Sequence, residues 1–171
     1  MKRLAALLAI VATPATAQTR CVTDVEAQAF ASVAMPEIIR QTGRVCATAL
    51  PATSLVRRAT GPFLAKYDAE ANRAWPVART AIVKLSDPAM EMLVQSEFAR
   101  PLITSLLVPQ LVGRIAVGDC PTIDRLIALL EPLPPRNTAG IVVATLKYLK
   151  AEKAKGRTVD VPDLPLCAEP R

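Results

Sequence analysis

The amino-acid sequence predicts an all-α protein, an irregular orthogonal array of six to eight mostly short helices with two disulfides. Three observations carry this prediction. The chain is rich in Ala and Leu, which favour helix, and no segment alternates apolar and polar residues as a half-buried strand does. Many of the 15 prolines stand where a segment with helical spacing begins, a position that proline tolerates.

Residues 1–17 are predicted to be a cleaved signal peptide. Lys2 and Arg3 precede an apolar run over 4–11, and the small residues of 15–17 fit cleavage before Gln18. The run is shorter than the roughly 20 apolar residues that span a bilayer. We therefore expect export to a bacterial periplasm, a single helical domain over 18–171, and no integral membrane protein.

The charge of the mature chain is modest. Without Lys2 and Arg3, 19 of the 21 basic residues remain against 15 acidic ones, which leaves a net charge of +4. This excess does not indicate a nucleic-acid-binding protein.

The first helix is expected over about 22–44. Thr23 followed by Glu26 is a capping box, in which the hydroxyl and the carboxylate each accept a backbone N–H bond. Pro36 lies inside the pattern and is expected to kink the helix or divide it in two.

Beyond residue 50 the prolines indicate where helices begin. Asp87-Pro88 is the clearest start, with the aspartate as N-cap. Pro76 is ambiguous, because it also fits a kink within one long helix over 62–85. The other proposed starts are Pro62, Pro101 and Pro121.

The stretch 101–118 is the most apolar part of the mature chain. We expect a central core helix kinked at Pro109. The alternative is a membrane-inserting segment, which is disfavoured because Arg114 interrupts it and no uncharged run reaches membrane length.

The stretch from Cys120 to Cys167 is predicted to be a helical hairpin with a cysteine at each end. Its second helix is expected to be capped by Asn137 or Thr138, to run to about Lys155 and to end at Gly156. An even number of cysteines in an exported chain predicts two disulfides, made from Cys21, Cys46, Cys120 and Cys167.

The hairpin favours a Cys120–Cys167 disulfide, and elimination then gives Cys21–Cys46. The second bond requires a chain reversal near Pro36, because an unbroken helix over 22–43 would be ~33 Å long. Two other pairings stay open.

Catalysis and metal binding are poorly supported. The chain contains no histidine, no Gly-x-Ser-x-Gly elbow, no glycine-rich phosphate loop and no Cys-x-x-Cys pair. We therefore expect no enzyme, no cofactor and no metal. A glycan-cleaving enzyme built on Asp68, Glu70 or Glu97 is a weak option, because helical residues two apart point about 200° apart.

Two further groups of residues are candidate binding sites. The last helix carries a basic stripe that could attract an anionic surface, although a solubilising face is the favoured interpretation. Three aromatic residues could line a pocket with Met90 and Met92, although core packing is favoured. The stripe comprises Lys147, Lys150, Lys153, Lys155 and Arg157, and the aromatic group Phe63, Tyr67 and Trp75.

The expected function is binding without catalysis. The sequence favours a small adaptor of the bacterial cell envelope, whose partner is a protein or an anionic envelope component. The alternative is a carrier of a small apolar ligand held between helices. No known family is identified from the sequence.

Overall fold

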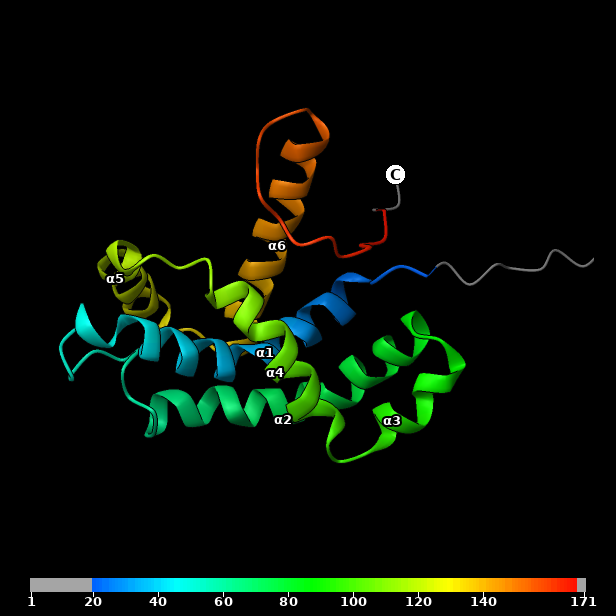
Figure 1. The fold of residues 1–171 in the computed structure, drawn as a ribbon, viewed down its shortest axis with the longest axis horizontal. Helices are drawn as coiled ribbons and strands as arrows, with labels where there is room; N and C mark the ends of the chain where they lie inside the picture. Colours follow the sequence, from blue (N-terminus) through cyan, green and yellow to red (C-terminus); the bar gives the residue numbers. More distant parts are fainter. Residues whose placement is uncertain (1–19, 169–171) are drawn as a thin grey trace, which may run out of the picture.

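Two long antiparallel helices form the centre of the fold. The computed structural model describes residues 20–168, so the predicted signal peptide lies outside the described residues. Helices α1 (Asp24–Val45) and α2 (Pro62–Leu85) lie side by side in opposite directions (Figure 1). The other helices are η1 (Cys46–Thr48), η2 (Pro88–Met90), α3 (Glu91–Gln95), α4 (Ala99–Val112), η3 (Val117–Asp119), α5 (Cys120–Leu130) and α6 (Pro135–Ala154).

The predicted all-α class is confirmed. Residues 20–168 contain six α-helices and three short 3-10 helices, and their only β-type pairing is an isolated parallel bridge between Val22 and Leu166. Helix α4 crosses the α1–α2 pair, and α6 rises steeply from it (Figure 1). The arrangement is irregular, as predicted (Figure 1).

Buried apolar side chains join the helices in separate clusters. One lies between α1 and α2 and contains Ile39, Phe63, Leu64 and Tyr67. Another joins the start of α1 to α6 through Val22, Ala27 and Val143, with Leu164 and Leu166 of the C-terminal segment packed against it. The C-terminal segment therefore belongs to the packed structure.

The prolines within long helices do not divide them. Pro36 lies inside α1 and Pro76 inside α2, so the division considered at Pro36 does not occur and 62–85 forms one helix. Each proline removes one backbone hydrogen bond, but extensive packing between α1 and α2 compensates for the loss. The start at Pro88 is confirmed, because Asp87 Oδ1 accepts a bond of 3.0 Å from the N–H of Ala89.

The preferred disulfide pairing is wrong. The disulfides are Cys21–Cys167, with Cα atoms 4.9 Å apart, and Cys46–Cys120, with Cα atoms 5.6 Å apart. Because α1 continues through Pro36, it holds Cys21 and Cys46 at opposite ends of a helix of 22 residues, which rises about 33 Å. The condition for a Cys21–Cys46 bond, a reversal near Pro36, is not met.

The predicted hairpin from 120 to 167 is also wrong. Helices α5 and α6 diverge, and α6 packs on α1 instead (Figure 1). Helix α6 starts at Pro135, so neither Asn137 nor Thr138 is its cap, and Thr138 lies buried beside Tyr67. The predicted end is close, because α6 stops at Ala154 and Gly156 adopts a φ of 85°.

The most apolar stretch is not the core. Helix α4 buries Ala99, Val108 and Val112, whereas Leu102, Leu106, Leu107 and Leu111 are exposed. The helix packs on α1 through a narrow stripe that includes Val108 and Val112. The alanine-rich faces of α1 and α2, rather than α4, fill the centre of the fold.

The capping box predicted for α1 is present and is tied to α2. The Thr23 N–H and hydroxyl donate to Glu26 at 2.8 and 2.9 Å, and Lys84 Nζ donates to both oxygens of the same carboxylate at 2.7 and 2.6 Å. Burial alone would raise the pKa of Glu26, but the bonds from Lys84 and Thr23 outweigh burial and lower the pKa below its usual value of 4.5.

Replacing Glu26 by glutamine is expected to reduce the free energy of unfolding by about 1 kcal/mol at pH 7. A lowered folded-state pKa stabilises the protein above the unfolded-state value, and this contribution disappears as the pH falls through the folded-state pKa. The difference in urea unfolding between wild type and Glu26→Gln should therefore be full at pH 7 and should shrink as the pH falls below 4.5. Glu97→Gln, which makes the same change at an exposed glutamate, is the control. A difference that stays constant as the pH falls contradicts the assignment.

Candidate functional site

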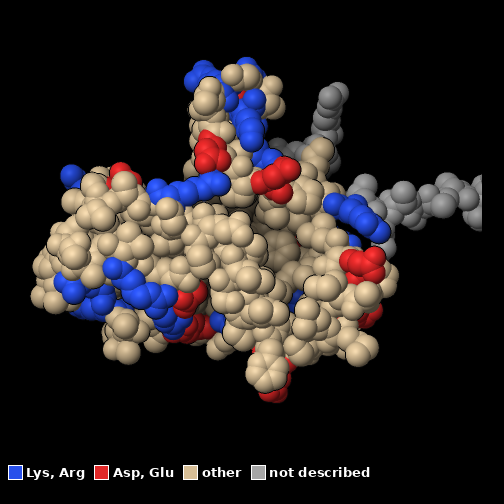
Figure 2. Space-filling view, viewed as in Figure 1, with Lys and Arg blue, Asp and Glu red and all other residues tan. Residues whose placement is uncertain are grey.

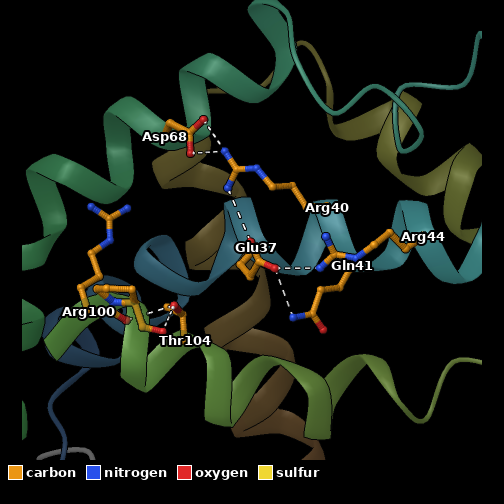
Figure 3. A network of polar contacts seen from close by, with 8 residues as sticks. Glu37, Arg40, Gln41, Arg44, Asp68, Arg100 and Thr104 are labelled. Carbon is orange, nitrogen blue, oxygen red and sulfur yellow. Dashed lines mark hydrogen bonds and ion pairs between the residues drawn. The ribbon is translucent and has the colours of Figure 1, made fainter. Parts of the chain in front are cut away.

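A cluster of charged residues links α1, α2 and α4 (Figure 3). Arg40 of α1 reaches α2, where its Nη2 donates to both oxygens of Asp68 at 2.8 Å. Glu37, one turn earlier on α1, accepts bonds from Arg44 at 3.0 Å and from Gln41 at 3.2 Å, and lies 3.8 Å from Arg40. These contacts connect both carboxylates of the cluster to guanidinium groups.

Arg100 of α4 is the third arginine of the cluster. Its side chain extends from α4 toward α2 (Figure 3). Its Nη1 donates to Asn72 Oδ1 of α2 at 2.5 Å. Burial lowers the pKa of Arg100, attraction to Asp68 raises it, and repulsion by Arg40 lowers it further. Arg100 is thus a partly desolvated cation that shares Asp68 with a second arginine.

An open groove of about 310 Å³ lies beside these charges. Its apolar walls are Val33 and Pro36 of α1 and Pro101 of α4. Its polar lining is Glu37, Arg40, Arg100 and Thr104. The Thr104 hydroxyl donates to the carbonyl of Arg100 at 3.0 Å, a bond within α4 that restricts rotation of the Thr104 side chain.

A second feature is an uncharged surface, which we call the α3–α4 apolar surface. Figure 2 shows that the middle of the face carrying α4 is largely free of charge, with both basic and acidic side chains around it. Met92 is 86% exposed, Phe98 78% and Leu106 61%. The surface comprises Met92, Leu93, Phe98, Leu102, Leu106, Leu107 and Leu111.

The predicted basic stripe largely pairs with acids of its own chain. Lys147 Nζ donates to Asp24 at 3.1 and 2.9 Å, and Lys150 lies 3.8 Å from Asp163. Lys155 and Arg157 both bind the buried carboxylate of Glu152, at 2.9 and 2.8 Å, and this contact raises the pKa of Lys155. Lys153 is exposed and lines a shallow groove of about 250 Å³ with Lys150.

The aromatic group does not come together as one pocket. Phe63 and Tyr67 are buried and pack edge to face, with ring centroids 5.2 Å apart. Trp75 packs against a different cluster, which contains Ala29, Val33 and Ala78. Met90 and Met92 are exposed.

The carboxylates considered for glycan cleavage have separate surroundings. Asp68 is bound by Arg40, and Glu70 accepts bonds from Arg73 at 3.1 and 2.6 Å. Glu97 is exposed on the segment before α4. The structure therefore does not bring these three side chains to one cleft.

The arginine cluster was not predicted from the sequence, although the spacing of its three residues on the first helix indicates that they share one face. Glu37, Arg40 and Arg44 are spaced by three and four residues and so share one face of a helix. The convergence of Asp68 and Arg100 on that face depends on how α1, α2 and α4 pack, which local spacing does not encode.

In the described part of the chain, no single helix has the length and apolar character needed to cross a membrane. Only the segments Ala99–Val112 and Val117–Leu130 together have that length and composition, and they meet at an angle of 86°.

Comparison with protein-family models, with curated proteins and with solved structures finds no match to this chain. The function is therefore inferred from the residues of this chain alone.

Proposed function

We propose that this protein is an exported, non-enzymatic binding protein of the bacterial cell envelope, and that it docks a partner protein through the α3–α4 apolar surface. The observation that carries the proposal is the exposure of large apolar side chains of α3 and α4, above all Met92, Phe98 and Leu106. Large exposed apolar areas mark interaction sites on protein surfaces.

The size of the surface supports a specific protein interface. Taking about 200 Å² for a large side chain, the seven residues expose an area on the order of 800 Å². This is about what each partner contributes to a standard stable interface. Three leucines of the surface, Leu102, Leu106 and Leu107, lie on a regular helix, and helix faces commonly dock in an apolar groove of a partner.

The charge distribution favours a protein over an anionic envelope polymer. The α3–α4 apolar surface contains no Lys or Arg, and Lys147, Lys150 and Lys155 of the last helix have acidic neighbours in their own chain. Export is supported by the predicted signal peptide and by two disulfides, which persist in oxidising compartments.

The proposal predicts site-specific cross-linking in the native host. A photoreactive amino acid at Leu106 should yield one adduct of defined mass, because the partner covers this side chain. Tyr148 of α6 is the matched control position, since its 62% exposure is nearly that of Leu106 at 61%.

Comparing adducts at positions 106 and 148 distinguishes docking on the α3–α4 apolar surface from non-specific cross-linking. An adduct at position 106 that is absent at 148, and that disappears with Leu102→Glu, supports docking on the α3–α4 apolar surface. No adduct at 106, or the same pattern of adducts at both positions, overturns it.

A further inference from the structure

The groove between α1 and α4 has an unbalanced charge. Three guanidinium groups, from Arg40, Arg44 and Arg100, face the two carboxylates of Glu37 and Asp68, so the cluster carries one net positive charge. Arg44 contacts the carboxylate of Glu37, and Arg40 contacts the carboxylate of Asp68. Arg100 has an amide partner, Asn72, at hydrogen-bond distance.

The surplus charge lies in the lining of the groove. Arg100 and Arg40 both line it, and they are close enough to repel each other. Both side chains are partly buried, so bulk water does not fully solvate their charges. An anion placed between them would relieve their repulsion and would supply Arg100 with a charged partner.

The walls restrict the kind of anion. Glu37 also lines the groove, and Arg40 of the lining already binds the carboxylate of Asp68, so a doubly charged phosphate would meet two carboxylates and only one surplus positive charge. A single carboxylate matches that surplus, and its planar oxygens suit the fork of a guanidinium. Val33, Pro36 and Pro101 offer apolar contacts to the body of such a ligand.

We infer that this groove binds a small organic acid, with its carboxylate on Arg100 and Arg40 and its apolar part against Pro36 and Pro101. The volume of about 310 Å³ suits a compact molecule. The lining of the groove and the α3–α4 apolar surface have no residue in common. The inference stands or falls independently of the proposed partner protein.

The test is a titration of the full oxidised chain with benzoate, followed by NMR. The amide of Thr104 and the Nε–H of Arg100 should shift together and saturate. Benzyl alcohol, which lacks the carboxylate, and inorganic phosphate, which carries more charge, should each bind at least tenfold more weakly than benzoate.

Two variants separate a specific site from general charge. Arg100→Gln should weaken benzoate binding at least tenfold, whereas Arg79→Gln, an exposed change of equal charge on α2, should leave it unchanged. Arg100→Lys keeps the positive charge but lacks the two-pronged guanidinium, so its loss of benzoate affinity should lie between those of Arg79→Gln and Arg100→Gln. This variant also tests the site if Arg100→Gln does not fold. Absence of saturation, equal losses at 79 and 100, or equal binding of phosphate or benzyl alcohol would overturn the inference.

Discussion

Replacing Cys46 and Cys120 together by alanine is expected to lower the free energy of unfolding by about 4 kcal/mol. The disulfide closes a loop of sequence separation 74, and its loss restores that freedom to the unfolded chain. Both cysteines are fully buried. Urea unfolding measures the loss, and a non-reducing digest of the parent should yield a cross-linked Cys46–Cys120 peptide.

Helix α5 is expected to suffer most from this change. Apart from the disulfide, it is held by Ile127 in the core clusters, by Asp124, which accepts a bond from Ser54, and by Lys66, which donates to carbonyls at its end. Amide hydrogens of α5 should therefore exchange faster than those of α2 in the variant.

The other disulfide provides a control for accessibility. Cys21 and Cys167 are partly exposed, so a mild reductant should open their bond first and leave Cys46–Cys120 intact. Simultaneous opening of both bonds, or a Cys46–Cys167 peptide, would contradict the structure.

Replacing Gly43 by alanine is expected to destabilise the protein by about 2 kcal/mol, although alanine ordinarily improves a helix. A Cβ at this position would overlap the backbone carbonyl of Val56, in the loop that packs on the end of α1. Backbone atoms cannot turn aside as a side chain can, so the loop would have to move. Thermal unfolding of the variant measures the effect.

Gly140 is the matched control, because it also lies inside a helix. A Cβ there would meet only the side-chain nitrogen of Gln28, at 2.9 Å, which donates to the carbonyl of Arg136 at 3.0 Å but ends a flexible side chain that can shift. Gly140→Ala should therefore leave stability unchanged or raise it by up to about 1 kcal/mol. Equal losses at 43 and 140 would show that the close approach at Val56 is unimportant.

Local features of the fold were predictable because their causes are local. The Thr23–Glu26 capping box and the Asp87-Pro88 start each depend on residues within one turn, and both occur as predicted. Composition and periodicity likewise sufficed for the all-α class.

The errors come from packing that no short window contains. The sequence leaves open whether Pro36 kinks its helix or divides it, and α1 continues through the proline because α2 packs along it. That continuity decides the disulfides, since it separates Cys21 from Cys46. The hairpin prediction failed for a related reason, because α6 finds its apolar partners on α1 rather than on α5.

The candidate sites show the same limit. Hydrophobicity alone placed 101–118 in the core, but α4 buries a narrow stripe and leaves Leu102 and Leu106 exposed. Two cations of the basic stripe have acidic neighbours in the structure, because Lys150 lies beside Asp163 and Lys155 beside Glu152. The second of these pairs is only three residues apart and was open to prediction.

The bond between Cys21 and Cys167 has a mechanical consequence. It joins the two ends of the described chain across a separation of 146 residues, beside the Val22–Leu166 bridge. A pulling force applied at the two termini therefore passes through one sulfur–sulfur bond and bypasses all six α-helices. While that bond is intact, the chain resists extension from its ends as a closed ring, however easily heat or urea unfolds what lies inside it.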